Sequence, residues 1–239
     1  MTSASQAPRR VVNRTIVLWD IDNTLLYTGG AGSLGMRRAF RDLYGVEDAF
    51  GRVEFSGRTD TAIFTDAARE RGIPDDRIGA ELPRFIDAYV RHLATTLHEV
   101  RGHLMPGVRE VLAALNEYDD VVVGLGTGNF RRGGELKLRH YGIDEHFPGI
   151  VGGFGEDSAL RDDVIASGIR RLASGDRNGH RVVVIGDTPH DVSAARANRA
   201  YALAVATGRN SVEELMACGA DAALDDLSDV ERVIALIRG

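Results

Sequence analysis

The chain of 239 residues is poor in two reactive residue types, with one cysteine, Cys218, and one lysine, Lys137. A single cysteine cannot form a disulfide within the chain, which excludes a small secreted fold held together by disulfides. The shortage of lysine is selective, because all the other basic residues among the 29 Lys and Arg are arginines. Any reaction that needs a lysine amine is therefore limited to one position.

Long hydrophobic runs are also missing from the sequence. The apolar run around Ile16 is short and ends in acidic residues, so it cannot span a bilayer. Residues 1–10 are polar and carry no apolar signal region, so we expect a disordered tail and a cytoplasmic protein. The formal net charge of -6 argues against nucleic acid or a membrane as partner, since both attract excess positive charge. The sequence does not define the oligomeric state.

The remaining composition is that of an ordinary globular protein, with 44% apolar and 27% charged residues. Short apolar runs predict strands that are buried on both faces, at 15–19, 121–125, 182–185 and, more weakly, 202–205. Helical patterns alternate with them at 108–116, 133–140, 162–173 and 191–197. This alternation predicts an α/β fold, a Rossmann-like parallel sheet core with helices on both faces.

The segment 28–103 breaks this rhythm. It holds no comparable β-branched run and shows helical patterns at 34–43, 60–71 and 78–99. We interpret it as an inserted α-helical domain within a core that is formed by residues 11–27 and 104–239. Pro106 is expected to open the next core helix.

Polar residues follow three of the predicted strands. Asp20 and Asp22 come after the first, the segment 127–129 after the second, and Asp187 and Asp191 after the third. Because the carboxyl ends of parallel strands meet at one edge of a sheet, we expect these clusters to converge on one crevice. Taken singly, each cluster is more typical of a turn or a helix N-cap than of a site. Their occurrence in order within one βα pattern favours a site.

The four carboxylates of this crevice indicate a metal. Strand periodicity points Asp20 and Asp22 to the same side, and neighbouring carboxylates at a buried strand end repel one another unless a cation or shared proton intervenes. Asp187 and Asp191 add to the cluster, and no lysine lies close to it in sequence. An all-oxygen ligand set of this kind suits a hard cation such as Mg²⁺.

These motifs resemble those of the haloacid dehalogenase-like hydrolase superfamily. Asp20-Ile21-Asp22-Asn23-Thr24 is similar to its first motif, Thr127 to its second, and Gly186-Asp187-Thr188-Pro189-His190-Asp191 to its fourth. The resemblance covers nearly the whole chain, and the helical insertion lies where the family has its cap. It implies a Mg²⁺-dependent phosphatase that hydrolyses a small phosphorylated metabolite. Phosphoglycolate phosphatase-like members are similar in cap placement and length.

The resemblance also implies a role for each motif residue. Asp20 would attack phosphorus and form an aspartyl-phosphate, while Asp22 would act as general acid and then as base. Thr127 would hydrogen-bond the transferring phosphoryl oxygens. Mg²⁺ would be held by Asp20, by Asp22 through its carbonyl, and by Asp187, with Asp191 in support. Substrate contacts are expected at Thr24, Gly128, Asn129 and Arg58, and a cap hinge is expected at Gly29, Gly30 and Gly32.

The third motif departs from the family pattern, which has a lysine there. The equivalent segment 155–163 has none, and Arg161 is the best substitute because arginine keeps its charge and can bind phosphate in a bidentate manner. Arg161 could instead be a solvated surface residue. Lys137 is the rival candidate, but it lies on the helix after the second motif. We interpret Lys137 as a packing and surface residue.

The cap segment and the reaction type each admit more than one interpretation. Arg58 is expected to face the site, although Thr59 or Asp60 as a helix N-cap would leave Arg58 merely exposed. Asp22 disfavours a dehalogenase, because a halide leaving group needs no proton. The lysine-free segment 27–103 argues against the Schiff-base phosphonate hydrolases of the superfamily. A phosphomutase of the same fold and a catalytically silent regulatory or binding protein stay open.

Overall fold

A parallel sheet forms the centre of the protein. The computed structural model describes residues 14–174 and 179–239, so the expected tail at 1–10 lies outside the described residues. Within those residues the sheet has six strands in the order β5-β4-β1-β6-β7-β8. Their bounds are β1 (Thr15–Trp19), β4 (Val121–Gly126), β5 (Gly152–Gly153), β6 (Arg181–Gly186), β7 (Tyr201–Val205) and β8 (Ala222–Leu224). The predicted α/β fold is confirmed, with β1 between β4 and β6.

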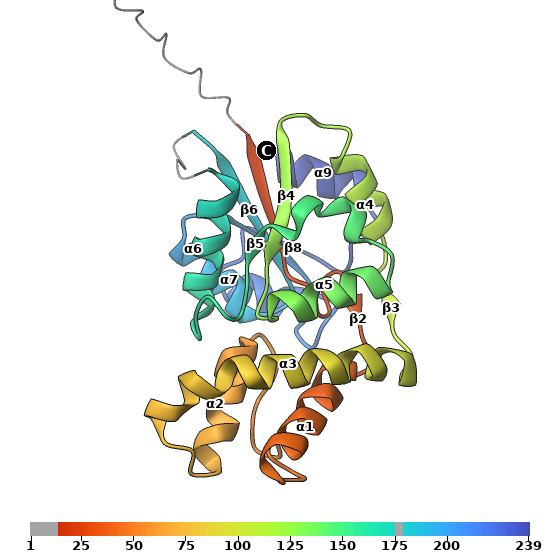
Figure 1. Cartoon of the computed structure of the whole chain (residues 1–239). Helices are drawn as coiled ribbons and strands as arrows, with labels where there is room; N and C mark the ends of the chain where they lie inside the picture. Colours follow the sequence, from red (N-terminus) through yellow and green to blue (C-terminus); the bar gives the residue numbers. More distant parts are fainter. Residues whose placement is uncertain (1–13, 175–178) are drawn as a thin grey trace, which may run out of the picture.

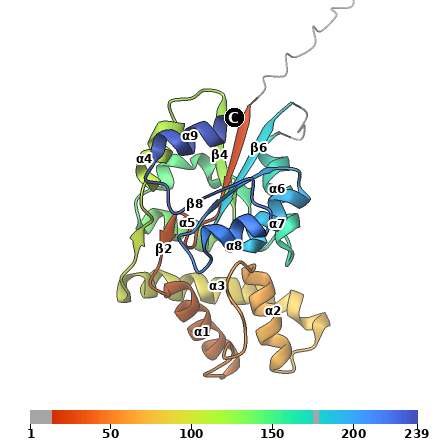
Figure 2. The same ribbon diagram turned by 180° about the vertical axis from the view of Figure 1, so that it is seen from behind.

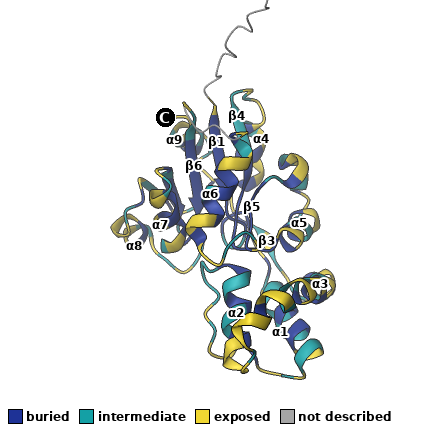
Figure 3. Ribbon diagram, turned by 60° about the vertical axis from the view of Figure 1, so that its left-hand side comes forward, coloured by how far each residue is buried: buried dark blue, intermediate teal, exposed yellow. Residues whose placement is uncertain are grey.

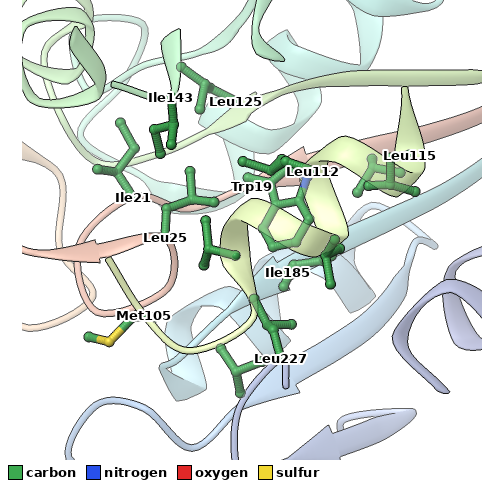
Figure 4. Packing of buried hydrophobic residues seen from close by; sticks show 14 of the residues in the cluster. Trp19, Ile21, Leu25, Met105, Leu112, Leu115, Leu125, Ile143, Ile185 and Leu227 are labelled. Carbon is green, nitrogen blue, oxygen red and sulfur yellow. The ribbon is translucent and has the colours of Figure 1, made fainter. Parts of the chain in front are cut away.

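Helices cover both faces of this sheet (Figures 1 and 2). Along β1, Val17 and Trp19 point into one hydrophobic cluster, while Ile16 and Leu18 point into the other. This alternation is the two-residue period of a strand that is buried on both sides. The first cluster packs against α4 (Val108–Leu115), α5 (Arg131–His140) and α9 (Val230–Arg238), and the second against α6 (Arg161–Leu172), α7 (Pro189–Ala197) and α8 (Val212–Ala217). Figure 4 shows Trp19 in the first cluster, close to Leu112 and Ile185.

Three helices between β1 and β4 lie beyond the carboxyl ends of the strands, at the bottom of Figure 1. We call them the cap helices: α1 (Ala31–Tyr44), α2 (Asp60–Glu70) and α3 (Asp75–Glu99). They share a third hydrophobic cluster that is rich in aromatic rings, among them Phe40, Phe64 and Phe85. Their buried residues face one another while the outer surfaces are exposed (Figure 3). The helical character of the insertion agrees with the sequence analysis.

The chain enters and leaves this helical segment side by side. β2 (Leu26–Tyr27) and β3 (His103–Leu104) pair antiparallel, next to the positions where the sequence divides core from cap. The division into domains at 27/28 and 103/104 stays a prediction. One side chain from the predicted core packs within the cap helices: Phe130, in the loop after β4, is buried in their aromatic cluster.

Some local predictions differ from the structure. α4 begins at Val108 rather than at Pro106, because Gly107 adopts a left-handed conformation with φ 80° and serves as its N-cap. β5 consists of two glycines and carried no apolar pattern in the sequence. The short helices η1 (Asp144–His146) and η2 (Pro148–Ile150) precede it. Among the helices of the described residues, none has both the length and the apolar character that crossing a membrane requires.

Candidate active site

The carboxyl ends of β1, β4 and β6 bring the three predicted polar clusters to one cavity of about 400 Å³. The cavity lies between the sheet and the cap helices, and both supply its walls. The sheet side includes Asp20, Asp22, Gly128, Asn129, Arg161 and Asp187, and the cap side includes Ser33, Met36, Arg58, Asp60, Ile63 and Tyr89. The expected convergence of the strand ends is therefore found.

Arg161 links two of the carboxylates at the cavity floor. As the first residue of α6 it is buried, and its Nη2 lies 2.7 Å from Asp20 Oδ1 and 2.6 Å from Asp191 Oδ1. Burial lowers the pKa of the Arg161 guanidinium, but the charges of Asp191 and Asp20 outweigh it, so the net shift is upward. Arg161 is thus a permanent cation beside Asp20, and its interpretation as a solvated surface residue is wrong.

Asp191 is fully engaged by hydrogen bonds. Its Oδ1 accepts from Nε and Nη2 of Arg161, at 3.1 and 2.6 Å, and its Oδ2 accepts from the backbone N and Oγ1 of Thr188, at 3.1 and 2.6 Å. The bond from the Thr188 backbone N is one half of the capping box at the start of α7, and the other half is the Asp191 backbone N, which donates to Thr188 Oγ1 at 3.3 Å. Because both oxygens are in use, the geometry favours a supporting role for Asp191, which holds Arg161, over direct metal contact.

Asp20 and Asp187 form the electrostatically strained part of the site. Burial raises the pKa of Asp20 to about 6, although the Arg161 charge opposes the shift. Burial raises the pKa of Asp187 to about 8, and the charges of Asp191 and Asp20 add to it. The partner of Asp187 is Thr24, whose Oγ1 donates to Asp187 Oδ1 at 3.4 Å. Buried carboxylates in this condition are stabilised by a cation.

The carboxylates of the site therefore fit a divalent cation. Oxygen atoms of Asp20, Asp187 and Asp191 lie within 4.8 Å of one another. Gly208 leaves room at this point, because a Cβ there would lie 1.9 Å from Asp187 Oδ2. The donor set is all oxygen, which suits Mg²⁺.

Asp22 is held by a second cation, Lys137. Lys137 Nζ lies 2.5 Å from Asp22 Oδ2 and 2.6 Å from Asn129 Oδ1, and the lysine side chain is only 3% exposed. Asn129 Nδ2 donates to Asp22 Oδ2 at 2.8 Å and to Thr127 Oγ1 at 2.9 Å. The interpretation of Lys137 as a packing and surface residue is wrong. The sequence held one indication that Lys137 is buried, because its spacing places it on the same face of α5 as Gly133 and Gly134, and this face is buried.

The cap is joined to the core by Asp60, a residue that the sequence analysis did not assign to the site. Asp60 Oδ2 accepts from the Phe130 backbone N at 2.8 Å, and its own N donates to the Gly128 carbonyl at 2.7 Å. Burial raises the pKa of Asp60 to about 7, with the Lys137 charge acting in the opposite direction. Its neighbour Thr59 is the N-cap of α2, one of the two N-cap positions that the sequence suggested.

Of the remaining predicted site residues, some border the cavity and others lie buried behind its walls. Gly128, Asn129 and Arg58 border the cavity, but the Arg58 guanidinium is paired within the cap, with Nη1 2.7 Å from Asp66 Oδ2. Thr24 and Thr127 are fully buried and do not border the cavity. The roles of all these residues stay predictions.

Comparison with known proteins identifies the family. Residues 17–205 match the model of the haloacid dehalogenase-like hydrolases, so the chain belongs to this family. The resemblance that the motifs indicated is thereby confirmed. No curated protein shows significant sequence similarity to the chain.

Solved structures share the fold at low sequence identity. A predicted phosphatase from Clostridium acetobutylicum is 17% identical with a TM-score of 0.67, covering 93% of this chain and 99% of that one. CbbY from Rhodobacter sphaeroides, solved in complex with phosphate, is 18% identical with a TM-score of 0.67 and coverages of 91% and 96%. A candidate β-phosphoglucomutase from Thermotoga maritima is 22% identical with a TM-score of 0.58 and coverages of 92% and 98%. At these identities the likeness concerns the fold alone.

Proposed function

We propose that the protein is a Mg²⁺-dependent phosphatase that hydrolyses a small phosphate monoester through an aspartyl-phosphate on Asp20. The observation that carries the proposal is the pairing of Asp20 with Arg161 at the floor of the cavity. This contact keeps Asp20 next to a permanent positive charge, where it can meet a phosphoryl group. A phosphorylated small molecule fits the volume and the polar walls of the cavity.

The reaction proceeds in two displacements at phosphorus. In the first, an Asp20 oxygen forms a bond to phosphorus while the ester P–O bond breaks, and Asp22 gives its proton to the leaving alcohol oxygen. In the second, Asp22 takes a proton from water as the water oxygen attacks phosphorus. The Asp20–phosphorus bond breaks, which releases inorganic phosphate and restores both carboxyl groups.

The positive charge for these steps comes from the chain and from the metal. Asp20, Asp187 and the Asp22 carbonyl would hold Mg²⁺, with Asp191 as support. When bound, Mg²⁺ supplies charge neutralisation between Asp20 and the incoming phosphate. Arg161 contributes a fixed cation on the same side of Asp20, in the role that the third-motif lysine has elsewhere in the family. Its planar guanidinium can contact phosphate while it keeps its hydrogen bond to Asp191.

A phosphomutase is the second candidate, because structural neighbours include candidate β-phosphoglucomutases. Such an enzyme would use the same nucleophile but return the phosphoryl group to a sugar phosphate in place of water. The two reactions are separated by product analysis, since only hydrolysis releases free phosphate in proportion to ester consumed. A catalytically silent protein is disfavoured by the intact set of Asp20, Asp22 and Arg161 around an open cavity.

The proposal is tested by phosphate release from p-nitrophenyl phosphate with Mg²⁺ and with excess EDTA. We expect turnover that depends on Mg²⁺ and falls by about 10³-fold or more in Asp20→Asn, which cannot form the acyl phosphate. Asp225→Asn, at an exposed aspartate that is not among the residues lining the cavity, is the matched control and should behave as wild type. Full activity in EDTA, or in Asp20→Asn, would refute the proposal.

A further inference from the structure

We propose that Lys137 is the positioning residue of Asp22. It fixes the carboxylate so that the free oxygen, Oδ1, faces the leaving-group oxygen of the ester. The site thereby becomes competent for esters of weakly acidic alcohols, whose oxygen must be protonated as it leaves. The inference rests on the proposed phosphatase function.

The contacts at the Asp22 carboxylate are asymmetric. Both hydrogen bonds that the described residues give to its carboxylate go to Oδ2, from Lys137 at 2.5 Å and from Asn129 at 2.8 Å. The Asp22 side chain is 39% exposed and borders the cavity. Since Oδ2 is held from the core side, Oδ1 is the atom that can reach a substrate. A carboxyl group with one oxygen anchored and one free is oriented for proton delivery.

Lys137 is itself fixed by its neighbours. Two of its three N–H donors are in use, and Asn129 connects it to the Thr127 hydroxyl at the end of β4. The ammonium group is enclosed from the cap side as well, because a Cβ at Gly32 would lie 3.5 Å from Nζ and 3.6 Å from the Tyr89 hydroxyl. A buried lysine held in this manner cannot swing to solvent, so the charge stays at one place behind Asp22.

The two cations of the site contact different carboxylates. Arg161 contacts Asp20 and Asp191, and Lys137 contacts Asp22 and Asn129. Arg161 is therefore placed to act on the nucleophile and the phosphoryl group, and Lys137 on the acid. Loss of Lys137 should alter the proton transfer to the leaving group more than the attack of Asp20. This difference distinguishes positioning of Asp22 from a general contribution to the fold.

The test is the dependence of kcat/KM on leaving-group acidity in aryl phosphates of similar shape, from p-nitrophenyl through phenyl to p-methoxyphenyl phosphate. This constant covers the steps through release of the phenol, so the later hydrolysis of the aspartyl-phosphate does not mask the effect. For wild type we expect a shallow dependence. In Lys137→Met we expect the loss on phenyl phosphate to exceed the loss on p-nitrophenyl phosphate by about tenfold or more, because nitrophenolate leaves without a proton.

Further variants make the result decisive. Asp22→Asn should show the same steep dependence, and the double variant with Lys137→Met should lose little more, because the two residues act as one unit. Lys137→Arg, which keeps the charge, should recover part of the shallow dependence. Arg139→Met, at an exposed position of the same helix, is the matched control and should leave the dependence unchanged. Lys137→Gln replaces Lys137→Met if thermal unfolding shows that the latter is not folded.

The inference is overturned if Lys137→Met lowers kcat/KM by the same factor for every ester, or if its effect adds fully to that of Asp22→Asn. Either result would assign Lys137 a structural role alone. Failure of the proposed function is recognised separately, because wild type would then release no phosphate from any of the esters. In that case the inference falls with it.

Discussion

At the residue scale, Asp20 and Asp22, the two carboxylates that we propose to react, are each paired with a different cation. Asp20 is paired with Arg161, which bridges to Asp191 through a planar group that can serve two carboxylates at once. Asp22 is paired with Lys137, a compact charge that also fits the Asn129 carbonyl. The proposed nucleophile, Asp20, is thus held beside the carboxylates that we propose as metal ligands, and the proposed acid, Asp22, is held apart from them.

Asp187 has no cation of its own among the described residues, which leads to a prediction about stability. Its folded pKa is raised to about 8, above the unfolded value near 3.8. The metal-free folded protein therefore binds a proton that the unfolded chain has lost, and this stabilisation disappears as the pH rises through about 8. Asp187→Asn has no carboxyl group at this position and so lacks this pH-dependent contribution. Between pH 6 and pH 9 in EDTA, the unfolding free energy of wild type should fall by about 2 kcal/mol more than that of Asp187→Asn.

Mg²⁺ should stabilise wild type more than Asp187→Asn. Bound metal stabilises the folded state by mass action, so the unfolding free energy of wild type should rise on addition of Mg²⁺, and that of Asp187→Asn should rise little. Urea denaturation at both pH values, with EDTA and with Mg²⁺, provides the four comparisons. Equal pH slopes for the two proteins in EDTA, or equal gains with Mg²⁺, would contradict the assignment of Asp187 to the metal.

The sequence predicted Asp20, Asp22, Asp187 and Asp191 because each one lies within a few residues of the end of an apolar strand. Lys137 could not be assigned in the same way, since it lies within a helix and a lysine there is usually exposed. Its burial results from the close approach of α5 to the cap, which Gly133 permits by coming within contact of Tyr89. Asp60 was missed for a similar reason, because its contact with Phe130 joins two segments far apart in the chain.

At the scale of elements, the loop between β4 and α5 is the point where core and cap meet. Gly128 lies there with its carbonyl bound to the Asp60 backbone N. A Cβ at position 128 would come 2.3 Å from the Arg58 carbonyl oxygen and 3.0 Å from Arg161 Nη1. Since the first of these is backbone, a side chain at this position must push the cap segment away from the sheet.

Gly128→Ala should therefore weaken both stability and substrate binding. We expect a loss of about 2 kcal/mol in unfolding free energy, typical of overpacking a tight interior, together with a raised KM for p-nitrophenyl phosphate. Gly79→Ala, in an open part of α3 with nothing within 4 Å, is the matched control. It should stabilise the protein by about 0.5 to 1 kcal/mol through helix propensity and leave KM unchanged. Wild-type stability and KM in Gly128→Ala would contradict this account of the core–cap contact.

The elements that the sequence predicted well are those with a complete apolar pattern. β1, β4, β6 and β7 carry runs of apolar residues because both of their faces are buried, and their bounds differ from the prediction by a residue at most. β5 and β8 are short edge strands of glycine or alanine and leucine, so their pairing depends on the neighbouring strand and not on a local pattern. The sequence analysis named no element beyond residue 205, where α8, β8 and α9 complete the sheet and its cover.

At the scale of the whole molecule, an acidic protein presents a cavity whose walls carry charges of both signs. The net charge is -6, and the cavity walls include the basic residues Arg161, Lys137, Arg37, Arg58 and Arg209 beside the acidic residues Asp20, Asp22, Asp60 and Asp187. These local cations, together with a metal, would allow a phosphate anion to approach against the overall charge. The cap helices restrict the cavity to a small molecule, which agrees with the substrate class that we propose.

The most direct test of the account is to trap the phosphoenzyme. Asp22→Asn, which lacks the base for the second displacement, is mixed with p-nitrophenyl phosphate and Mg²⁺ and quenched in acid. Borohydride reduction then marks any acyl phosphate, and peptide mass spectrometry identifies its position. The account predicts the mark at Asp20 and at no other carboxylate. Turnover without any acyl phosphate, or a mark at another residue, would contradict it.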